Sequence, residues 1–345
     1  MKTLRLFLAS LLGTAPIHAS SITYEGGSGP GQGKHIVFLA SDHEYRSDES
    51  CPALARILAK HRGFTCTVVF GVDADGFIEA GSSRVAGLEA LEKADLFVIS
   101  ARFLNLPDDQ MAQVVAYLDR GGPVVGLRTS SHAFKIPAGS KYGKYDFKSK
   151  AADYENGFGQ QILGNTWVGH YGTNHKQGTR ITTVPEQRGH VVLTGVGETA
   201  FCHAGAYVGK AGPDFTVLTT SQPLVSMDPG SEPDASKPPM PSTWMRHYAA
   251  KDGTKHRVFH TTQGASEDIL DDNYRRLVIN GILWAAGLEK EIKAGLDISF
   301  VGPYRPGTFS FGGYARQVKP SDLSGWDSPI MPERPREEAK KAKRK

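Results

Sequence analysis

Residues 35–46 read HIVFLASDHEYR, an apolar run that passes directly into six polar residues. An unbroken apolar run of this length is typical of a strand that is buried on both faces of a sheet. Residues 52–63 then predict a helix, because Pro52 suits a helix start, Gly63 suits a helix stop, and apolar residues recur between them at helical spacing.

The alternation of strand and helix continues to residue 127. We expect further strands at 66–70, 96–100 and 124–127, and helices at 84–93 and 107–122. This order predicts an α/β fold with a parallel sheet, right-handed crossovers and helices on both faces. Such sheets bind ligands at the carboxyl ends of their strands, so polar residues at those ends are candidates for a site.

The second half of the chain is less regular. Residues 135–156 read as a long loop, and loops of that length are usually functional or disordered. Short β-like runs follow at 179–184, 190–193 and 215–220, a Pro-rich surface excursion at 228–241, a strand pair at 243–248 and 257–262, and a helix at 271–287. We therefore expect one α/β domain over residues 34–290 with a β-rich insertion, and an extended tail over 291–345 with a basic end.

Composition excludes several classes of protein. The chain has 345 residues, of which 39% are hydrophobic and 22% charged, which matches no disordered, collagen-like or coiled-coil class. The formal net charge of +4 arises at the ends, since the last fifteen residues carry seven Lys or Arg against three Glu. The part between the ends is close to neutral, so we expect no nucleic-acid partner.

The N-terminus predicts export. Lys2 and Arg5 precede the apolar run 6–12, and residues 17–19 resemble a cleavage site, which together are typical of a signal peptide over residues 1–19. A strand buried in the fold is the alternative for this run. No apolar segment reaches the roughly 20 residues that span a bilayer, so we expect a periplasmic or extracellular protein without a membrane span.

Cysteines offer little chemistry. Cys51, Cys66 and Cys202 allow at most one disulfide, and the chain has no Cys-x-x-Cys pair. The sequence therefore supports neither a thiol redox site nor a cysteine-rich zinc site.

The first candidate residues follow the first strand: Asp42, His43, Glu44, Tyr45 and Arg46. Adjacent His and Glu side chains can supply an acid and a base if their surroundings separate their pKa values, and Arg46 can bind an anion or polarise a carbonyl. The alternative is a solvated loop with acids that cap a helix.

The fourth strand ends in a similar cluster. Gly126 precedes the place where nucleophile-elbow enzymes hold Ser or Cys, and Arg128 occupies that place here. Ser131 and His132 could be read as a nucleophile and its base. Neighbours in sequence face each other only in an unusual turn, and no G-x-S-x-G frame is present, so we disfavour a serine hydrolase.

A third cluster contains Trp167, His170, Tyr171, Asn174 and His175. The two histidines, with His132 or His43, could ligate a transition metal. No carboxylate lies at ligand spacing, so we favour hydrogen-bonding roles and expect no cofactor. The last candidates are His203, Tyr207, Gln263, Glu267 and Asp268, and each of these alone reads more readily as an ordinary loop residue.

Residues 35–288 resemble the ThuA-like (trehalose utilisation) proteins, which share the flavodoxin-like fold of class I glutamine amidotransferases. The motifs that carry the resemblance are SDHEYR at 41–46, GLRTSSHAF at 126–134, WVGH at 167–170, TTQGA at 261–265 and YRRLVIN at 274–280. FGGY at 311–314 and VKPSDL at 318–323 resemble the exported ThuA-like proteins of planctomycete-type bacteria. The resemblance implies a flavodoxin-like, doubly wound and mainly parallel sheet with a β-rich insertion.

The resemblance also implies a place in bacterial sugar catabolism. ThuA-like proteins work beside sugar oxidoreductases that make 3-keto-glycosides, so a step on a keto-sugar or disaccharide is implied. The shared motifs contain His43, Glu44, Arg46, Arg128, His132 and His170. Glutamine amidotransferase chemistry does not carry over, because Arg128 replaces the nucleophilic Cys and a guanidinium stays protonated. Many ThuA-like proteins have His where this chain has Arg128.

The leading hypothesis is a sugar-active lyase, hydrolase or isomerase that works by acid–base chemistry. His132 or His170 would be the base, Glu44 its acid partner, and Arg128 with Arg46 the stabilisers of an enolate or oxyanion. Tyr45, Phe134 and Trp167 could stack on a pyranose. Further substrate contacts are assigned to Asp42, Ser131, His175, Tyr207 and Gln263. A non-catalytic carbohydrate-binding or accessory protein and a His-ligated metallohydrolase remain as alternatives.

Overall fold

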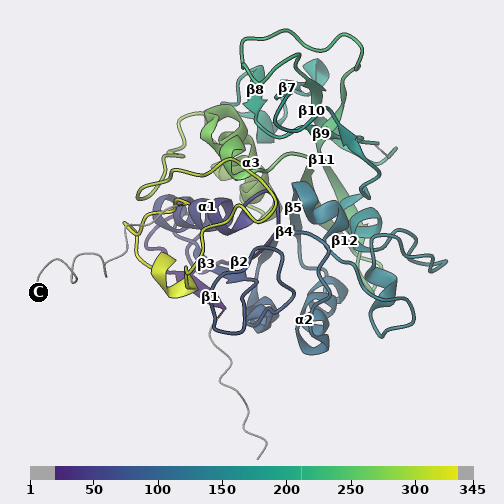
Figure 1. Cartoon of the computed structure of the whole chain (residues 1–345), viewed down its shortest axis with the longest axis vertical. Helices are drawn as coiled ribbons and strands as arrows, with labels where there is room; N and C mark the ends of the chain where they lie inside the picture. The colour runs from purple at the N-terminus through teal and green to yellow at the C-terminus, as the bar shows by residue number, and fades with distance from the viewer. Residues whose placement is uncertain (1–19, 211, 333–345) are drawn as a thin grey trace, which may run out of the picture.

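A ten-stranded sheet runs through the molecule (Figure 1). The computed structural model describes residues 20–210 and 212–332, so the predicted signal peptide and the basic end of the tail lie outside the described residues. The strands are β1 (Ser21–Tyr24), β2 (His35–Ser41), β3 (Thr65–Phe70), β4 (Leu96–Ala101), β5 (Val124–Leu127), β6 (His170–Tyr171), β7 (Thr179–Thr183), β8 (Thr199–Cys202), β9 (Ala206–Tyr207), β10 (Thr216–Pro223), β11 (Met240–Ala249) and β12 (Lys255–Thr261).

Three α-helices and several short helical turns connect these strands. The α-helices are α1 (Ser47–Arg62), α2 (Asp108–Asp119) and α3 (Asp272–Ala285). The short turns are η1 (Leu88–Lys93), η2 (Arg128–His132), η3 (Gly143–Tyr145), η4 (Gly159–Leu163), η5 (Pro185–Gln187), η6 (Val191–Leu193), η7 (Ser266–Leu270), η8 (Glu289–Glu291) and η9 (Pro320–Leu323).

One half of the sheet is parallel. Its strands lie in the order β3-β2-β4-β5-β12, and each neighbouring pair is parallel. Numbered along the chain, this is the order 2-1-3-4-5 of flavodoxin-like doubly wound folds, so the predicted fold class is confirmed. The carboxyl ends of these strands meet along one edge, where the polar motifs lie.

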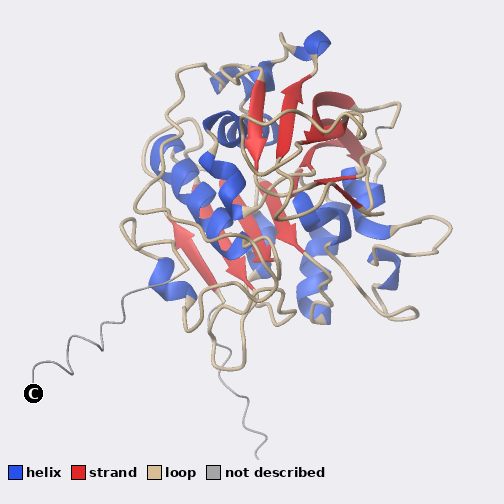
Figure 2. Ribbon diagram, turned by 45° about the horizontal axis from the view of Figure 1, so that its top comes forward, coloured by secondary structure: helices blue, strands red, loops and turns tan. Residues whose placement is uncertain are grey.

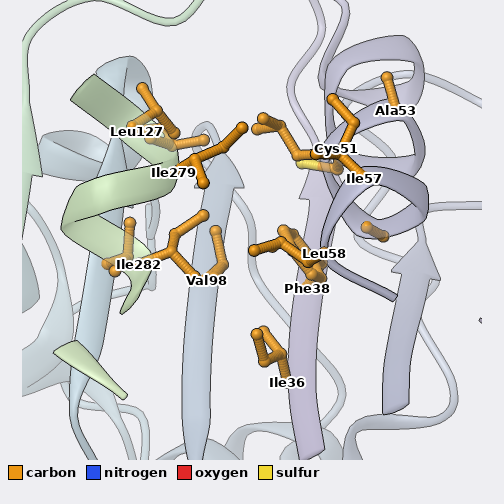
Figure 3. Packing of buried hydrophobic residues seen from close by; sticks show 14 of the residues in the cluster. Ile36, Phe38, Cys51, Ala53, Ile57, Leu58, Val98, Leu127, Ile279 and Ile282 are labelled. Atoms are coloured by element: carbon orange, nitrogen blue, oxygen red, sulfur yellow. The ribbon is translucent and has the colours of Figure 1, made fainter. Parts of the chain in front are cut away.

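The hydrophobic core fills both faces of the parallel half. On one face, Ile57 and Leu58 of α1 and Ile279 and Ile282 of α3 pack with strand residues such as Phe38 (Figure 3). On the other face, residues of α2 pack with alternate residues of the same strands. Burial of both faces explains why these strands read as unbroken apolar runs.

The β-rich insertion between β5 and β12 extends the same sheet. Strands β11, β10, β7 and β8 continue it beyond β12, each antiparallel to its neighbour, while β6 and β9 form a separate two-stranded ribbon. Figure 1 shows β7, β8 and β10 at the opposite end of the molecule from β1, and Figure 2 shows helices on both sides of the strands.

Several predicted elements differ from the structure. Helix α1 begins at Ser47 instead of near Pro52, with acidic residues in its first turn, where the helix dipole favours them. The helix expected at 84–93 is reduced to η1, because Gly87 adopts φ 118° directly before it. The β-like run at 190–193 is a single helical turn that the His190 ring caps at the Val192 N–H. Strand β1, which pairs with β3, was not predicted.

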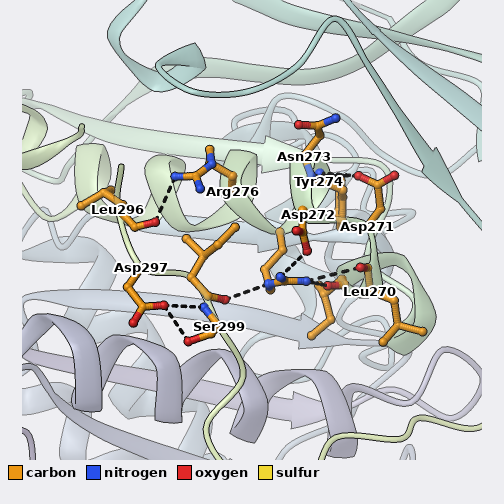
Figure 4. A network of polar contacts seen from close by, with 12 residues as sticks. Leu270, Asp271, Asp272, Asn273, Tyr274, Arg276, Leu296, Asp297 and Ser299 are labelled. Atoms are coloured by element: carbon orange, nitrogen blue, oxygen red, sulfur yellow. Dashed lines mark hydrogen bonds and ion pairs between the residues drawn. The ribbon is translucent and has the colours of Figure 1, made fainter. Parts of the chain in front are cut away.

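The segment after α3 returns along the first face. Arg276 donates to the Leu296 carbonyl at 3.2 Å (Figure 4). Arg62 of α1 donates to the Asp297 carbonyl at 2.8 Å. Residues 296–299 are thus fastened to both helices. None of the helices in the described ranges is long and apolar enough to cross a membrane, and the three cysteines are buried and free.

Candidate functional site

The turn after β2 is organised by Asp42. Its Oδ1 accepts hydrogen bonds from the backbone N–H groups of Glu44, at 2.7 Å, and Tyr45. Asp42 is buried, and its Oδ2 has no hydrogen-bond partner among the described residues. This carboxylate shapes the turn that presents His43, Glu44 and Tyr45.

Glu44 is held by residues from two other segments. It forms a buried ion pair with Arg102, which follows β4, and its Oε1 accepts from Asn174 Nδ2 at 3.3 Å. Asn174 also donates to the Tyr45 hydroxyl at 2.9 Å and accepts from the Gly205 N–H at 3.0 Å. Both carboxylate oxygens of Glu44 therefore accept hydrogen bonds. Glu44 would have to lose at least one of these bonds to carry a proton and act as an acid.

Arg128 lies between two tyrosine rings. It is fully buried with φ 40°, and its guanidinium carbon lies 3.7 Å from the Tyr45 ring centroid and 4.4 Å from that of Tyr207. Its Nη1 donates to the carbonyls of Gly205 at 2.9 Å and Thr262 at 3.1 Å. Its Nε and Nη2 have no partner within the described chain, so charged donors stay free in a buried setting.

His132 is enclosed by aromatic side chains. Ring centroids of Phe103, Trp167 and Tyr207 lie 5.1, 5.3 and 5.7 Å from its own. Burial, followed by the charges of Arg102 and Arg128, lowers the pKa of His132 well below its usual value. The imidazole is therefore neutral at pH 7, and its Nε2 finds no hydrogen-bond partner in residues 20–210 or 212–332.

Ser131 contacts the other nitrogen of this ring. The helical turn η2 brings Ser131 Oγ to 3.0 Å from His132 Nδ1. The turn is therefore of the unusual kind in which these two neighbours meet, contrary to the expectation from sequence. A hydroxyl at Nδ1 fixes the ring orientation and leaves Nε2 to meet a substrate.

His170 and Tyr207 face each other across the β6–β9 ribbon. Their rings stack at 5.5 Å and 14°, and the Trp167 centroid lies 5.8 Å from that of His170. Desolvation, followed by the charge of Arg128, lowers the pKa of His170, although its side chain is exposed. Burial raises the pKa of Tyr207 well above its usual value, and its hydroxyl has no partner among the residues described. Tyr207 therefore stays protonated and can donate.

A cavity of about 490 Å³ is lined by aromatic side chains that also lie near the His132 ring, while His132 itself is fully buried behind them. Phe103, Phe147 and Trp167 form its apolar wall, and all three rings also lie near the His132 ring. Lys135, Asp146 and Lys148 add charged groups to its lining. Aromatic faces with polar groups around them suit a ring that is apolar on one face and carries hydroxyls at its edge.

Of the candidates from the sequence, Trp167 is the one among the described residues that lines this cavity, and several others lie elsewhere. Phe134 packs against Phe158 in the core on the α2 face. His175 stacks on Phe309 at 4.4 Å. Arg46 contacts Glu49 at 2.5 Å and donates to the Gly313 carbonyl, so it faces the C-terminal segment. His43 is half-buried between Phe103 and Phe311, and burial lowers its pKa, while the nearby Asp42 raises it.

Gln263 is fully buried beside Arg128. Its backbone carbonyl accepts from the Arg128 N–H at 3.1 Å, and neither polar atom of its side chain has a partner within the described ranges. This open amide adds to the unpartnered polar atoms near Arg128.

Sequence reasoning missed three residues that build the site: Arg102, Phe103 and Phe147. Arg102 and Phe103 directly follow β4, and ligands bind at the carboxyl ends of such strands, so the same reasoning applied to β4 would have found them. Phe147 lies in an irregular segment, where no pattern marks it. Asn174 belongs to the third cluster, but sequence reasoning assigned it no role, and its bond to Glu44 is seen in the structure.

The described residues hold no group of three His, Cys, Asp or Glu side chains placed to bind a metal ion. His132, His170 and His43 are separated by aromatic rings that contact them from several sides.

The family model described as "Trehalose utilisation" (ThuA) matches residues 36–285. No curated protein matches the chain. A solved structure of a ThuA-like protein from Parabacteroides merdae is similar with 16% identity and a TM-score of 0.47, covering 81% of this chain and 96% of that one. A ThuA-like protein from Bacteroides uniformis is similar with 14% identity and a TM-score of 0.45, covering 79% and 98%. The glutaminase domain of Trypanosoma brucei CTPS shows 11% identity and a TM-score of 0.36, covering 74% and 94%.

Proposed function

Because the chain belongs to the ThuA (trehalose utilisation) family, we propose that it is an exported enzyme of carbohydrate catabolism that acts by acid–base chemistry on a keto-glycoside or disaccharide. The family match supports a carbohydrate-related role. The observation that carries the catalytic part is His132, a neutral, fully buried imidazole whose Nε2 has no partner among the described residues and whose ring lies near the three aromatic side chains that line the cavity.

His132 acts as the general base in this proposal. Its Nε2 removes a proton from the carbon beside a sugar carbonyl, while Ser131 holds Nδ1. The low pKa keeps the base form populated at neutral pH. Cleavage of a glycosidic bond or isomerisation would then proceed from the resulting enolate.

Charge that develops on the carbonyl oxygen meets the free donors of Arg128 and the hydroxyl of Tyr207. Donors already in place in a buried site stabilise such charge without reorganisation. Both oxygens of Glu44 are engaged by Arg102 and Asn174, so Glu44 is better suited to positioning than to proton donation. The protonated His132 then returns its proton to the departing glycosidic oxygen, or to the neighbouring carbon in an isomerisation, while Tyr207 keeps its proton and donates a hydrogen bond to the enolate oxygen.

Trp167, Phe103 and Phe147 provide the stacking surface for a pyranose. This assignment keeps Trp167 from the sequence-based candidates and replaces Tyr45 and Phe134, whose rings contact Arg128 and the core. A sugar oxidoreductase of the same pathway would supply the keto-glycoside. Export to the periplasm or beyond rests on residues 1–19, and N-terminal sequencing of the secreted protein tests it by showing whether the chain starts at Ser20.

The proposal is tested with protein that starts at Ser20. Trehalose and 3-keto-trehalose are offered with and without EDTA, and NMR follows turnover while thermal shift follows binding. Product formed from the keto-sugar in both conditions supports the proposal. Stabilisation without product indicates a carbohydrate-binding protein, loss of activity with EDTA indicates a metallohydrolase, and no response to either sugar contradicts the proposal.

A further inference from the structure

Residues 305–314 cross the lip of the site although they lie beyond the matched region 36–285. They follow residues 296–299, which are hydrogen-bonded to α3 (Figure 4) and to Arg62 of α1, and they return to the turns after β2 and β12. We call residues 305–314 the C-terminal strap.

The turn after β2 holds one side of the strap. Arg46 donates to the Gly313 carbonyl at 2.6 Å, and Glu49 accepts from the Gly307 N–H at 3.2 Å. The Gly312 N–H donates to the His43 carbonyl at 3.4 Å. Arg46 and Glu49 also contact each other, so the two members of one buried ion pair bind the strap at Gly313 and Gly307.

The turn after β12 holds the other side. Ser266 Oγ donates to the Gly307 carbonyl at 3.2 Å, and Glu267 accepts from Thr308 Oγ1 at 3.2 Å and from the Phe309 N–H at 3.4 Å. The Phe309 ring is fully buried, with its centroid 5.1 Å from that of Tyr45 and 4.4 Å from that of His175. These contacts set the position of the next aromatic residue, Phe311.

Phe311 is 65% exposed, and it is the one aromatic among the exposed large hydrophobic side chains of the described chain. Its ring centroid lies 5.4 Å from that of His43, and the Arg102 guanidinium carbon lies 5.2 Å from it. Arg102 is 6% exposed, and its Nε has no partner among the described residues. An open aromatic face thus lies beside a buried cation with a free donor.

This face adjoins the cavity beside His132. Phe103 lines that cavity, and its ring centroid lies 5.1 Å from that of His132 and 6.1 Å from that of His43. Arg102 lies over both Phe103, at 5.0 Å, and Phe311. The cavity and the exposed face of Phe311 are therefore neighbours, and Phe103 and Arg102 lie between them.

We propose that Phe311, His43 and Arg102 form a second sugar subsite, which binds the second hexose of a disaccharide while the first occupies the cavity beside His132. The proposal rests on the proposed function of that cavity and extends it to the substrate class. Phe311 stacks on the apolar face of the hexose, and Arg102 Nε and the His43 ring meet its hydroxyls. Arg46 and Glu49 are positioning residues that hold the strap.

The test compares a disaccharide with a monosaccharide. Dissociation constants for trehalose and for glucose are measured by calorimetry for the wild type, Phe311→Ala, Trp167→Ala and a control, Leu270→Ala, which alters a side chain that is 44% exposed and lies outside both subsites. Loss of one stacking contact weakens affinity by about tenfold. We expect Phe311→Ala to weaken the affinity for trehalose by that factor and to leave the affinity for glucose unchanged. Trp167→Ala should weaken the affinity for both sugars, and Leu270→Ala should change neither. Phe311→Tyr should retain wild-type affinity for trehalose.

A second variant changes the strap without changing Phe311. A Cβ at residue 307 would lie 2.6 Å from Arg46 Nη1 and 2.8 Å from Pro332 Cγ, so Gly307→Ala displaces the strap. This variant should weaken the affinity for trehalose but not that for glucose. Unchanged trehalose affinity in Phe311→Ala, or equal loss for both sugars, overturns the subsite while the cavity proposal stands. A wild type that binds neither sugar overturns both.

Discussion

Asp268, which follows β12, and Arg128 and His132, which follow β5, are buried polar side chains at the ends of neighbouring parallel strands, but their hydrogen-bonding groups are satisfied to different degrees. After β12, Asp268 is fully buried and accepts from the N–H groups of His203, Gly264, Ala265 and Ala204 at 2.8, 2.9, 2.9 and 3.4 Å. After β5, Arg128 and His132 are equally buried, yet they keep polar atoms without partners in the described chain. A saturated buried carboxylate holds a fold together, whereas buried groups left open are available to a ligand.

The largest effect should come from His132→Gln. The amide keeps a polar group of similar reach but cannot take the proton, so turnover of 3-keto-trehalose should fall by about 10²–10⁴-fold. The melting temperature should fall only modestly, because the substitution removes the Ser131 contact and ring packing, while Nε2 makes no hydrogen bond in the described structure. Turnover within threefold of wild type would place the base elsewhere.

Asp268→Ala should show the reverse pattern. Four backbone donors lose their acceptor in a buried turn, which should lower the free energy of unfolding by at least about 3 kcal/mol. Urea denaturation measures this loss, and Asp268→Asn, which keeps one acceptor oxygen, should lose less. An Asp268→Ala protein as stable as the wild type would show that the hydrogen bonds to Asp268 do not stabilise the fold.

The pH dependence of stability and of activity tests the buried state of His132. Because the pKa of His132 is lowered below 6.5 in the folded chain, the unfolded chain takes up a proton below that pH that the folded chain refuses. The free energy of unfolding should therefore fall as pH drops below 6.5, and this component should vanish in His132→Gln. The acid limb of kcat/KM should lie well below pH 6.5. A limb centred at 6.5 would mean that the base has an ordinary histidine pKa.

The smallest effect should come from Ser131→Ala. Its Oγ orients the His132 ring at 3.0 Å without taking part in proton transfer, so kcat should fall by about tenfold with little change in KM. A loss as large as that of His132→Gln would instead indicate that Ser131 takes part in the chemistry.

The two halves of the sheet differ in how well the sequence predicts them. Strands 35–41, 65–70, 96–101 and 124–127 are buried on both faces and read as apolar runs, so the parallel half was predicted nearly to its ends. The antiparallel half was predicted less well. β8 has an exposed residue at Thr199, and residues 190–193 read as a strand but form the turn η6, since an adjacent side chain caps their backbone.

The arrangement of the candidate residues was predicted in part. Because ligands of such sheets bind at the carboxyl ends of the strands, the sequence placed His43, Glu44, Arg128 and His132 at one edge. The sequence could not show that Arg46 turns toward the strap, because that depends on a positive φ and on Gly313, distant in sequence. Arg102 was missed, and the contact of Asn174 with Glu44 was not foreseen, since both contacts form only in the folded chain.

Hydrogen exchange at the carbon beside the carbonyl tests the central claim, that His132 is the base, most directly. 3-Keto-trehalose is incubated in D₂O with the wild type or with His132→Gln, and NMR follows loss of the proton signal at that carbon. The account predicts deuterium incorporation with the wild type and none above background with His132→Gln. Equal exchange with both proteins, or no exchange with the wild type, would contradict it.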